Sequence, residues 1–222
     1  MNSIIEILIK YQDGFISGLL VTLELCLIIW FFGLVIGVFL GVMAYRYPKS
    51  IGVPTKIFSF ILSGIPILVF LFWLHYPAQS ILNIVIDPFF TAAFAITLFN
   101  IIAVTDIIKE GIANLPKQFI EVAKLCNINQ KKQIIKIQLP LIFRHVLPSL
   151  ILTQVNMLHM TLFASLISVE EIFRISQRIN SLEYKPIEIY TALGVFFLLI
   201  SLPINGFALY LKHKFTRNFS EK

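Results

Sequence analysis

The chain has 222 residues, of which 58% are hydrophobic and only 14% are charged, and its formal net charge is +6 at pH 7. Soluble domains carry about 25% charged residues, so this composition excludes a disordered chain, a nucleic-acid-binding arm and most cytosolic enzymes. The two cysteines, Cys26 and Cys126, lie in different segments and form neither a disulfide framework nor a metal-binding signature.

Charged residues are nearly absent from five long stretches of the sequence. The first stretch contains a single charge, Glu24, and the others contain none. A bilayer core about 30 Å thick requires roughly 20 apolar residues in a helix, and the stretches are of this order or longer. We therefore predict an all-α membrane protein with one transmembrane domain, residues 1–222, and five transmembrane helices. The predicted spans are approximately 15–44, 57–77, 88–107, 148–169 and 188–211.

Lysine and arginine are distributed unevenly among the segments outside these spans. Segments on alternate sides contain 14 and four of these residues. Cytoplasmic segments of membrane proteins carry the excess of positive charge. We therefore predict that the N-terminus lies outside and the C-terminus in the cytoplasm, which requires an odd number of spans.

The segment between the third and fourth spans, approximately residues 109–147, is longer than a simple helix connection needs. Its pattern predicts two short amphipathic helices, at 118–126 and 130–138, around a tight turn. Asn129 is positioned to cap the second helix, and Leu139-Pro140 to end it. Such a hairpin either lies on the membrane surface, held by lysines against anionic lipid, or docks a cytoplasmic partner.

The same segment resembles a known motif. Glu121-Val122-Ala123 is followed after three residues by Asn127 and after nine more by Ile137-Gln138-Leu139-Pro140. This spacing is similar to that of the EAA loop of ABC-importer permeases, Glu-Ala-Ala, three residues, Gly, nine residues, Ile-x-Leu-Pro. Val122 and Asn127 depart from the pattern, but asparagine is the next-best residue to glycine for a positive φ, so the turn can form.

The resemblance extends over nearly the whole chain, to the polar amino-acid uptake permeases. Gly18–Leu25 is similar to the opening helix of that family, Ser63–Val69 to its Arg-Gly-Thr-Pro-Leu-Leu-Val stretch, and Asp106–Ile112 to its Glu-x-x-Arg-Gly-Gly-Ile. His159-Met160-Thr161-Leu162 stands where the family usually has Lys-Asp-Thr-Ser. The resemblance implies the type I ABC-importer permease fold, in a bacterial cytoplasmic (inner) membrane.

The resemblance also implies partners and a coupling surface. The chain has no Gly-x-x-x-x-Gly-Lys-Ser/Thr phosphate-binding loop, so ATP is expected to be used by a separate ABC ATPase subunit and no cofactor is expected on this chain. A second permease subunit, identical or related, an external solute-binding protein and the lipid bilayer are the other expected partners. The residues that the resemblance assigns to ATPase coupling are Phe119, Glu121, Val122, Ala123, Asn127, Ile137, Leu139 and Pro140.

Polar residues inside the predicted spans are candidates for lining a translocation path. They are Thr97, Asn100, Asn156, His159, Thr161 and Ser165. Hydroxyl residues at helical spacing also permit close helix packing, and a histidine within a membrane also serves as a structural hydrogen-bonding group. Gly33, Gly37 and Gly41 form a ridge of small residues that lets another helix approach closely, from the same subunit or from a second one.

Three classes of function fit a polytopic membrane protein of this kind. The favoured class is a permease subunit of an ATP-driven importer, with polar amino acids as the leading cargo. The alternative is a proton-coupled carrier or channel, although the spans contain few ionisable residues for a proton relay. The third class is a membrane enzyme. The four histidines are scattered and no His-Glu-x-x-His pair, nucleophile elbow or carboxylate cluster is present, so we predict that the chain is not an enzyme.

Overall fold

The computed structural model describes the backbone of residues 2–220, and the side chains of residues 4–215 except those at positions 117, 119, 120, 124, 130 and 131. Every regular element in this part of the chain is helical, which confirms the all-α prediction. The α-helices are α1 (Asn2–Lys10), α2 (Gln12–Arg46), α3 (Val53–Ser63), α4 (Ile67–Trp73), α5 (Gln79–Leu82), α6 (Pro88–Ala113), α7 (Lys117–Leu125), α8 (Gln130–Gln133), α9 (Leu139–Met160), α10 (Ile172–Glu183) and α11 (Pro186–Ser220). Short π-helical stretches, η1 (Pro48–Gly52), η2 (Leu74–Ala78) and η3 (Ile134–Gln138), and the 3-10 helix η4 (Thr161–Ile167) extend them.

Four helical segments of the described chain are long and apolar enough to cross a membrane. They are Gln12–Arg46, Pro88–Ala113, Ile134–Ile167 and Pro186–Phe215. A bent pair, Pro48–Ser63 with Ile67–Leu82, passes the same test if its two halves count as one span, which brings the number to five. The predicted spans therefore correspond to observed helices, and most of the observed helix ends lie beyond the predicted ones.

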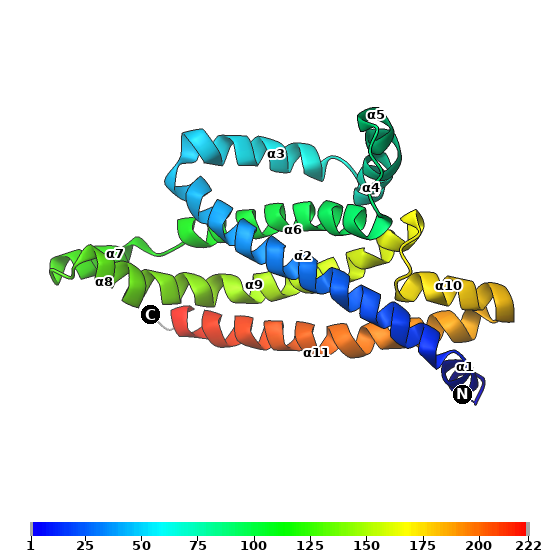
Figure 1. Cartoon of the computed structure of the whole chain (residues 1–222). Coiled ribbons are helices and arrows are strands. Elements are labelled where there is room, and N and C mark those ends of the chain that lie inside the picture. Colours follow the sequence, from blue (N-terminus) through cyan, green and yellow to red (C-terminus); the bar gives the residue numbers. More distant parts are fainter. Residues whose placement is uncertain (1, 221–222) are drawn as a thin grey trace.

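The predicted span at 57–77 is a broken helix rather than a straight one. Its two halves meet at 93° around Gly64, Ile65 and Pro66. Proline has no N–H to donate and disfavours helical geometry in the residue before it, so α3 ends at Ser63 and a new helix starts after Pro66, whose ψ is 132°. In Figure 1, α3 runs along the bundle and α4 turns away from it.

The glycine ridge of α2 packs against α6 within the same chain. A Cβ atom added at Gly37 would lie 2.6 Å from the Val104 Cβ, and one added at Gly41 would lie 2.7 Å from the Ile108 Cβ. These distances are shorter than real Cβ contacts, so only glycine permits this approach. α2 and α6 consequently pack closely where they cross, and Figure 1 shows this crossing. The prediction of a close helix approach is confirmed, and the partner helix is intramolecular.

The second helix of the predicted hairpin does not end at Leu139-Pro140, and that prediction is wrong. Helix continues from Gln130 through η3 into α9. Pro140 lies in the first turn of α9, where a missing N–H costs nothing, and Leu139 keeps helical angles, φ −56° and ψ −50°. The Leu139 N–H donates to the Ile134 carbonyl, one residue further back than in an α-helix, so a π-turn absorbs the proline.

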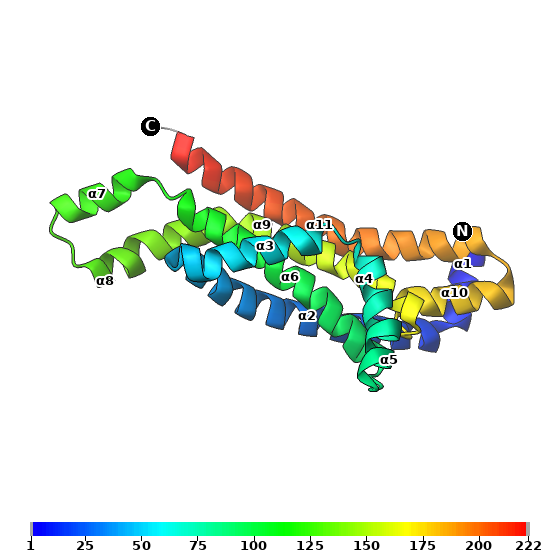
Figure 2. The ribbon, with the colours of Figure 1, turned by 90° about the horizontal axis from the view of Figure 1, so that it is seen from above.

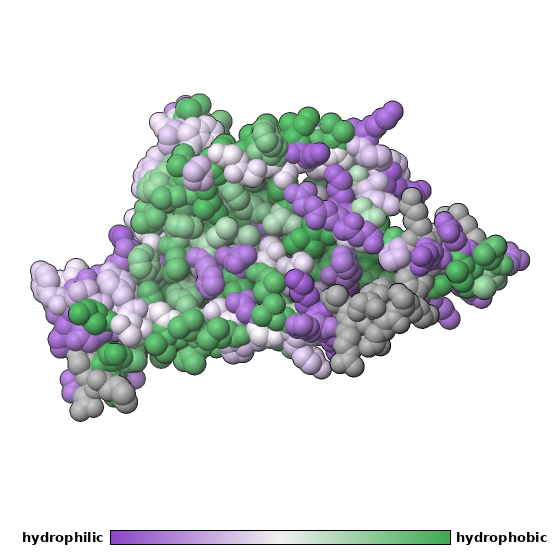
Figure 3. Space-filling view, turned by 180° about the vertical axis from the view of Figure 1, so that it is seen from behind, coloured by the Kyte–Doolittle hydropathy of each residue, from purple (hydrophilic) through white to green (hydrophobic). Residues whose placement is uncertain are grey.

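The bundle has two distinct ends. The α7–α8 segment and the C-terminal part of α11 lie at one end, and α1 and α10 lie at the other (Figures 1 and 2). Large apolar side chains cover much of the outer surface, including Leu27, Phe39 and Phe60, which are 65%, 65% and 79% exposed. Figure 3 shows a broad hydrophobic area over the body of the bundle, with hydrophilic residues towards the α7–α8 end and also at the opposite tip. This surface suits a lipid environment.

Candidate functional site

Residues 117–138, which we name the coupling hairpin after the role that the resemblance predicts for them, are built on a left-handed turn. Asn127 has φ 52°, as the sequence predicts. The Ile128 N–H donates to the Ala123 carbonyl at 3.0 Å, and the Cys126 N–H donates to the Val122 carbonyl at 2.9 Å, which closes the end of α7. The Asn129 carbonyl then accepts the first bond of the next helix, from the Gln133 N–H at 2.9 Å. These bonds hold α7 in a defined direction relative to α8.

The exposed surface of α7 matches the predicted coupling residues only in part. Val122 and Leu125 are 57% and 87% exposed, and Glu121 is also exposed. Ala123 is only 2% exposed, so its side chain belongs to the interior of the chain rather than to a docking surface. Sequence reasoning missed Leu125, although its position three residues after Val122 signals a shared face. The Phe119 side chain lies outside the described side chains.

The last three residues of the predicted coupling motif connect the hairpin to α9. Ile137 is half-buried, and Leu139 and Pro140 are exposed. They lie on the π-turn and the first turn of α9, which continue as one helical path into the membrane-spanning segment. The hairpin and α9 are therefore joined by helical backbone rather than by a flexible loop. Figure 2 shows α7 and α8 projecting beyond the ends of α6 and α9.

Asn100, a predicted path residue, is fully buried and ties three helices together. Its Nδ2 donates to the Ile29 carbonyl of α2 and to Gln154 Oε1 of α9, both at 2.9 Å. Gln154 Nε2 donates back to Asn100 Oδ1 at 3.2 Å, and Trp30 Nε1 donates to the Gln154 carbonyl at 3.0 Å. This network satisfies polar groups inside an apolar bundle, so the structure places Asn100 in a packing role.

Thr161 and Ser165 are buried and bond to their own helical stretch. The Thr161 hydroxyl donates to the Leu158 carbonyl, and the Ser165 hydroxyl donates to the Leu162 carbonyl, both at 2.7 Å. Their contacts agree with the packing alternative. Thr97 Oγ1 is buried and has no hydrogen-bond partner among the described residues.

Asn156 and His159 are exposed on α9, apart from the buried group. The His159 ring contacts the Phe197 ring of α11 edge-on, with centroids 6.0 Å apart. The structure therefore divides the six path candidates into four within the helix packing and two on the open surface of this chain. A single chain does not bring all six to one cavity.

The opposite end of the bundle contains a buried carboxylate that sequence reasoning missed. Glu171 precedes α10 and is fully buried, and its two oxygens accept from the Phe173 and Arg174 N–H groups at 3.0 and 2.8 Å. The Ile172 N–H donates to the Thr22 hydroxyl of α2 at 3.2 Å. Burial raises the pKa of the Glu171 carboxyl to about 7, against the opposing effect of the two N–H groups. Glutamate is not a common helix cap, so no local signal singles it out.

Comparisons with known proteins agree with this architecture. A family model described as "Binding-protein-dependent transport system inner membrane component" matches residues 33–217. The histidine/lysine/arginine/ornithine transport system permease protein HisM of Escherichia coli is 29% identical over 214 residues, which are 89% of this chain and 90% of the relative. The octopine transport system permease protein OccM of Rhizobium radiobacter is 24% identical over 194 residues, 84% of this chain and 79% of the relative.

Solved structures share the fold. A chain in the crystal structure of an amino acid ABC transporter with histidines superposes with a TM-score of 0.83 at 22% identity, covering 93% of this chain and 96% of that chain. A chain of the MetNI methionine ABC transporter in an inward-facing conformation gives a TM-score of 0.69 at 16% identity, covering 91% and 98%. Since the family model matches most of the sequence, the chain belongs to the binding-protein-dependent transport system inner membrane components, the permease subunits of ABC importers.

Proposed function

We propose that this chain couples ATP hydrolysis on a separate ABC ATPase to the import of polar amino acids, through the coupling hairpin. The observation that carries the proposal is the α7 face formed by Glu121, Val122 and Leu125, which is exposed at the end of the bundle on a hydrogen-bonded turn. Two apolar side chains beside a carboxylate form a suitable surface for a groove in a protein partner. The helical connection through η3 to α9 supplies a stiff path for movement.

Charge supports the proposed direction of insertion. The coupling hairpin and the end of α11 lie at the same end of the bundle, and both are rich in lysine (Figure 1). Under the positive-inside rule this end is cytoplasmic, where an ATPase would be, and α1 and α10 are external. The external end would then be the surface for a solute-binding protein.

A second permease subunit completes the proposed path. Asn156 and His159 are exposed on a helix whose apolar length lies in the membrane, where polar side chains normally face protein or water. A second copy or a related chain facing this side of α9 would place both residues at an interface. Polar amino acids are the proposed cargo because the relatives HisM and OccM are named as permease proteins of a histidine/lysine/arginine/ornithine and of an octopine transport system.

The test is co-expression with candidate ABC ATPases, followed by measurement of complex formation and of ATPase activity in proteoliposomes. Leu125→Ser removes the most exposed apolar contact, and we expect about tenfold weaker binding of the ATPase. Glu121→Ala is expected to reduce transport-coupled ATPase activity more than it reduces folding. Leu182→Ser is the matched control, because Leu182 is 65% exposed at the opposite end of the bundle, on α10.

The outcomes separate the importer from the alternatives. Uptake of histidine, arginine or glutamine that requires ATP and is lost with Leu125→Ser supports the proposal. Normal membrane insertion with unchanged ATPase binding and stimulation in both hairpin variants would contradict it. Uptake that follows a proton gradient without any ATPase would move a carrier or channel ahead.

A further inference from the structure

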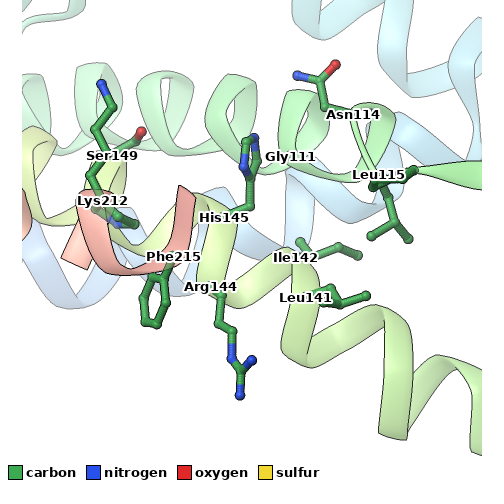
Figure 4. Close-up of a pocket in the computed structure, with 12 residues that line it drawn as sticks. Gly111, Asn114, Leu115, Leu141, Ile142, Arg144, His145, Ser149, Lys212 and Phe215 are labelled. Carbon is green, nitrogen blue, oxygen red and sulfur yellow. The ribbon is translucent and has the colours of Figure 1, made fainter. Parts of the chain in front are cut away.

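A cavity of about 340 Å³ lies beside the coupling hairpin, where α6, α9 and α11 come together. The end of α6 contributes Asn114, α9 contributes His145 and Ser149, and α11 contributes Lys212 and Phe215 (Figure 4). Neither the coupling face of α7 nor any predicted path residue lines it. The proposed function therefore leaves this cavity without a role.

The polar lining of the cavity is cationic. Its described lining includes Arg144, His145 and Lys212 and contains no aspartate or glutamate. In Figure 4 the His145 and Lys212 side chains extend towards α6, with Ser149 beside Lys212, whereas the Arg144 guanidinium points to the other side of α9. An ammonium, an imidazole and a hydroxyl can each donate a hydrogen bond, which is the chemistry that an oxyanion needs.

The cavity lies at the boundary between the apolar and the charged parts of its helices. Lys212 is the first charged residue after the uncharged run 189–211 of α11, and Arg144 is the last charged residue before the uncharged run 145–169 of the α9 segment. In a spanning helix such a boundary marks the headgroup level of the bilayer. Leu141, Ile142 and Phe215 add apolar walls to the same cavity, and these suit the start of an acyl chain.

We propose that this cavity binds the phosphate of an anionic phospholipid from the leaflet at the hairpin end, with Lys212 and His145 as the recognising groups. Basic pockets between transmembrane helices are a general way of holding anionic headgroups. A bound lipid here would contact α6, α9 and α11 together. It would therefore hold the helix that continues into the coupling hairpin against its neighbours.

The test is lipid retention by the protein purified with its ATPase partner, measured by native mass spectrometry after exchange into phosphatidylglycerol or phosphatidylcholine. Lys212→Gln and His145→Gln are each expected to lower the affinity for phosphatidylglycerol, about fivefold for the lysine. Ser149→Trp keeps every charge and is expected to lower it by filling the cavity. Lys214→Gln is the matched control, since Lys214 lies on the same helix, over the Tyr210 ring and not in the cavity lining.

The proposal is supported by loss of phosphatidylglycerol in Lys212→Gln and Ser149→Trp together with its retention in Lys214→Gln. Phosphatidylcholine should show no specific binding. Equal loss in Lys214→Gln would show general surface attraction and overturn the proposal. Displacement of the lipid by millimolar inorganic phosphate would assign the cavity to a soluble anion and also overturn it. Unchanged retention of phosphatidylglycerol in all variants would show that its binding does not depend on the cavity, and would overturn the proposal. Protection of the cavity only when the ATPase is bound would assign this surface to a protein contact, and would also overturn the proposal.

Discussion

Several buried polar side chains in this protein form hydrogen bonds that join two helices. Asn100 and Gln154 exchange hydrogen bonds across α6 and α9, and Thr22 receives the Ile172 N–H at the start of α10. In a membrane environment no water replaces such a partner, so each pair fixes the relative position of two helices. Asn156 and His159 on α9 are by contrast exposed on this chain.

Asn100→Leu is expected to destabilise the protein by about 1–2 kcal/mol, because the Gln154 amide loses its partner inside the bundle. The apparent melting temperature in detergent should fall accordingly. Asn156→Leu is the matched control, since Asn156 is exposed on the neighbouring helix, and its melting temperature should stay near that of the wild type. Adding Gln154→Leu to Asn100→Leu should recover part of the loss; a further additive loss would argue against the network.

Glu171 predicts a pH dependence of stability at the α10 end. Its folded-state pKa of about 7 is above the ordinary value of 4.5, so the folded protein binds a proton that the unfolded chain releases between these values. The contribution of Glu171 to stability should therefore be greatest below pH 4.5, fall as pH rises towards 7, and level off above that value.

Melting curves across this pH range test the carboxyl directly. Glu171→Gln should remove the fall in stability between pH 4.5 and 7 that Glu171 causes, because the glutamine side chain has no proton to release. Glu170→Gln is the neighbouring control: Glu170 is 51% exposed and paired with Arg178 at 3.0 Å, and the wild-type profile should persist. A Glu171→Gln profile identical to that of the wild type would assign the pH dependence to another group.

At the scale of the elements, the α2–α6 crossing is set by residues without side chains. Gly33, Gly37 and Gly41 recur every four residues and therefore lie along one face of α2. Against them lie Asn100, Val104 and Ile108, at the same spacing on α6. Because the glycines have no side chains, the α6 side chains lie directly against the α2 backbone. The two backbones are therefore close, and the Thr105 hydroxyl donates to the Gly37 carbonyl at 3.3 Å.

Gly37→Leu is expected to destabilise the bundle by about 1–3 kcal/mol through overpacking, since even a Cβ atom would approach the Val104 side chain at 2.6 Å. Thermal unfolding in detergent measures the effect. Gly206→Leu on α11 is the control, because a Cβ atom there meets nothing within 4 Å. Equal melting temperatures for both variants would contradict the close α2–α6 contact.

At the scale of the whole molecule, the coupling hairpin and α10 lie at opposite ends, so the proposed orientation makes a simple prediction. Cys126 is exposed in the hairpin and Cys26 is buried in α2. In cells that express the chain without an ATPase, a membrane-impermeant thiol reagent should leave the wild-type protein unlabelled, whereas inverted vesicles should label Cys126.

Two variants complete the orientation experiment. Cys126→Ser should abolish labelling in inverted vesicles. Adding Ser181→Cys to Cys126→Ser places a thiol at an exposed position of α10, which should be labelled in intact cells with a permeabilised outer envelope. Labelling of Cys126 from outside would reverse the proposed topology, and with it the assignment of the hairpin to the cytoplasm.

The sequence by itself determined the features that depend on local chemistry. Apolar runs of membrane length predicted the helices, and the tolerance of asparagine for positive φ predicted the turn at Asn127. The glycine spacing on α2 predicted a close helix approach. Each of these follows from one segment alone, because helix length, hydropathy and backbone angles are set by neighbours along the chain.

Only the tertiary structure decided which side chains are available for function. Val122 and Ala123 are adjacent and both apolar, yet Val122 is exposed and Ala123 is buried. Asn100 and Asn156 both interrupt apolar helices, yet only Asn100 is buried. The continuation of helix through Leu139-Pro140 and the cationic cavity between three helices are likewise invisible in the sequence. Burial depends on the helices that pack against a residue, and those contacts join segments far apart in the chain.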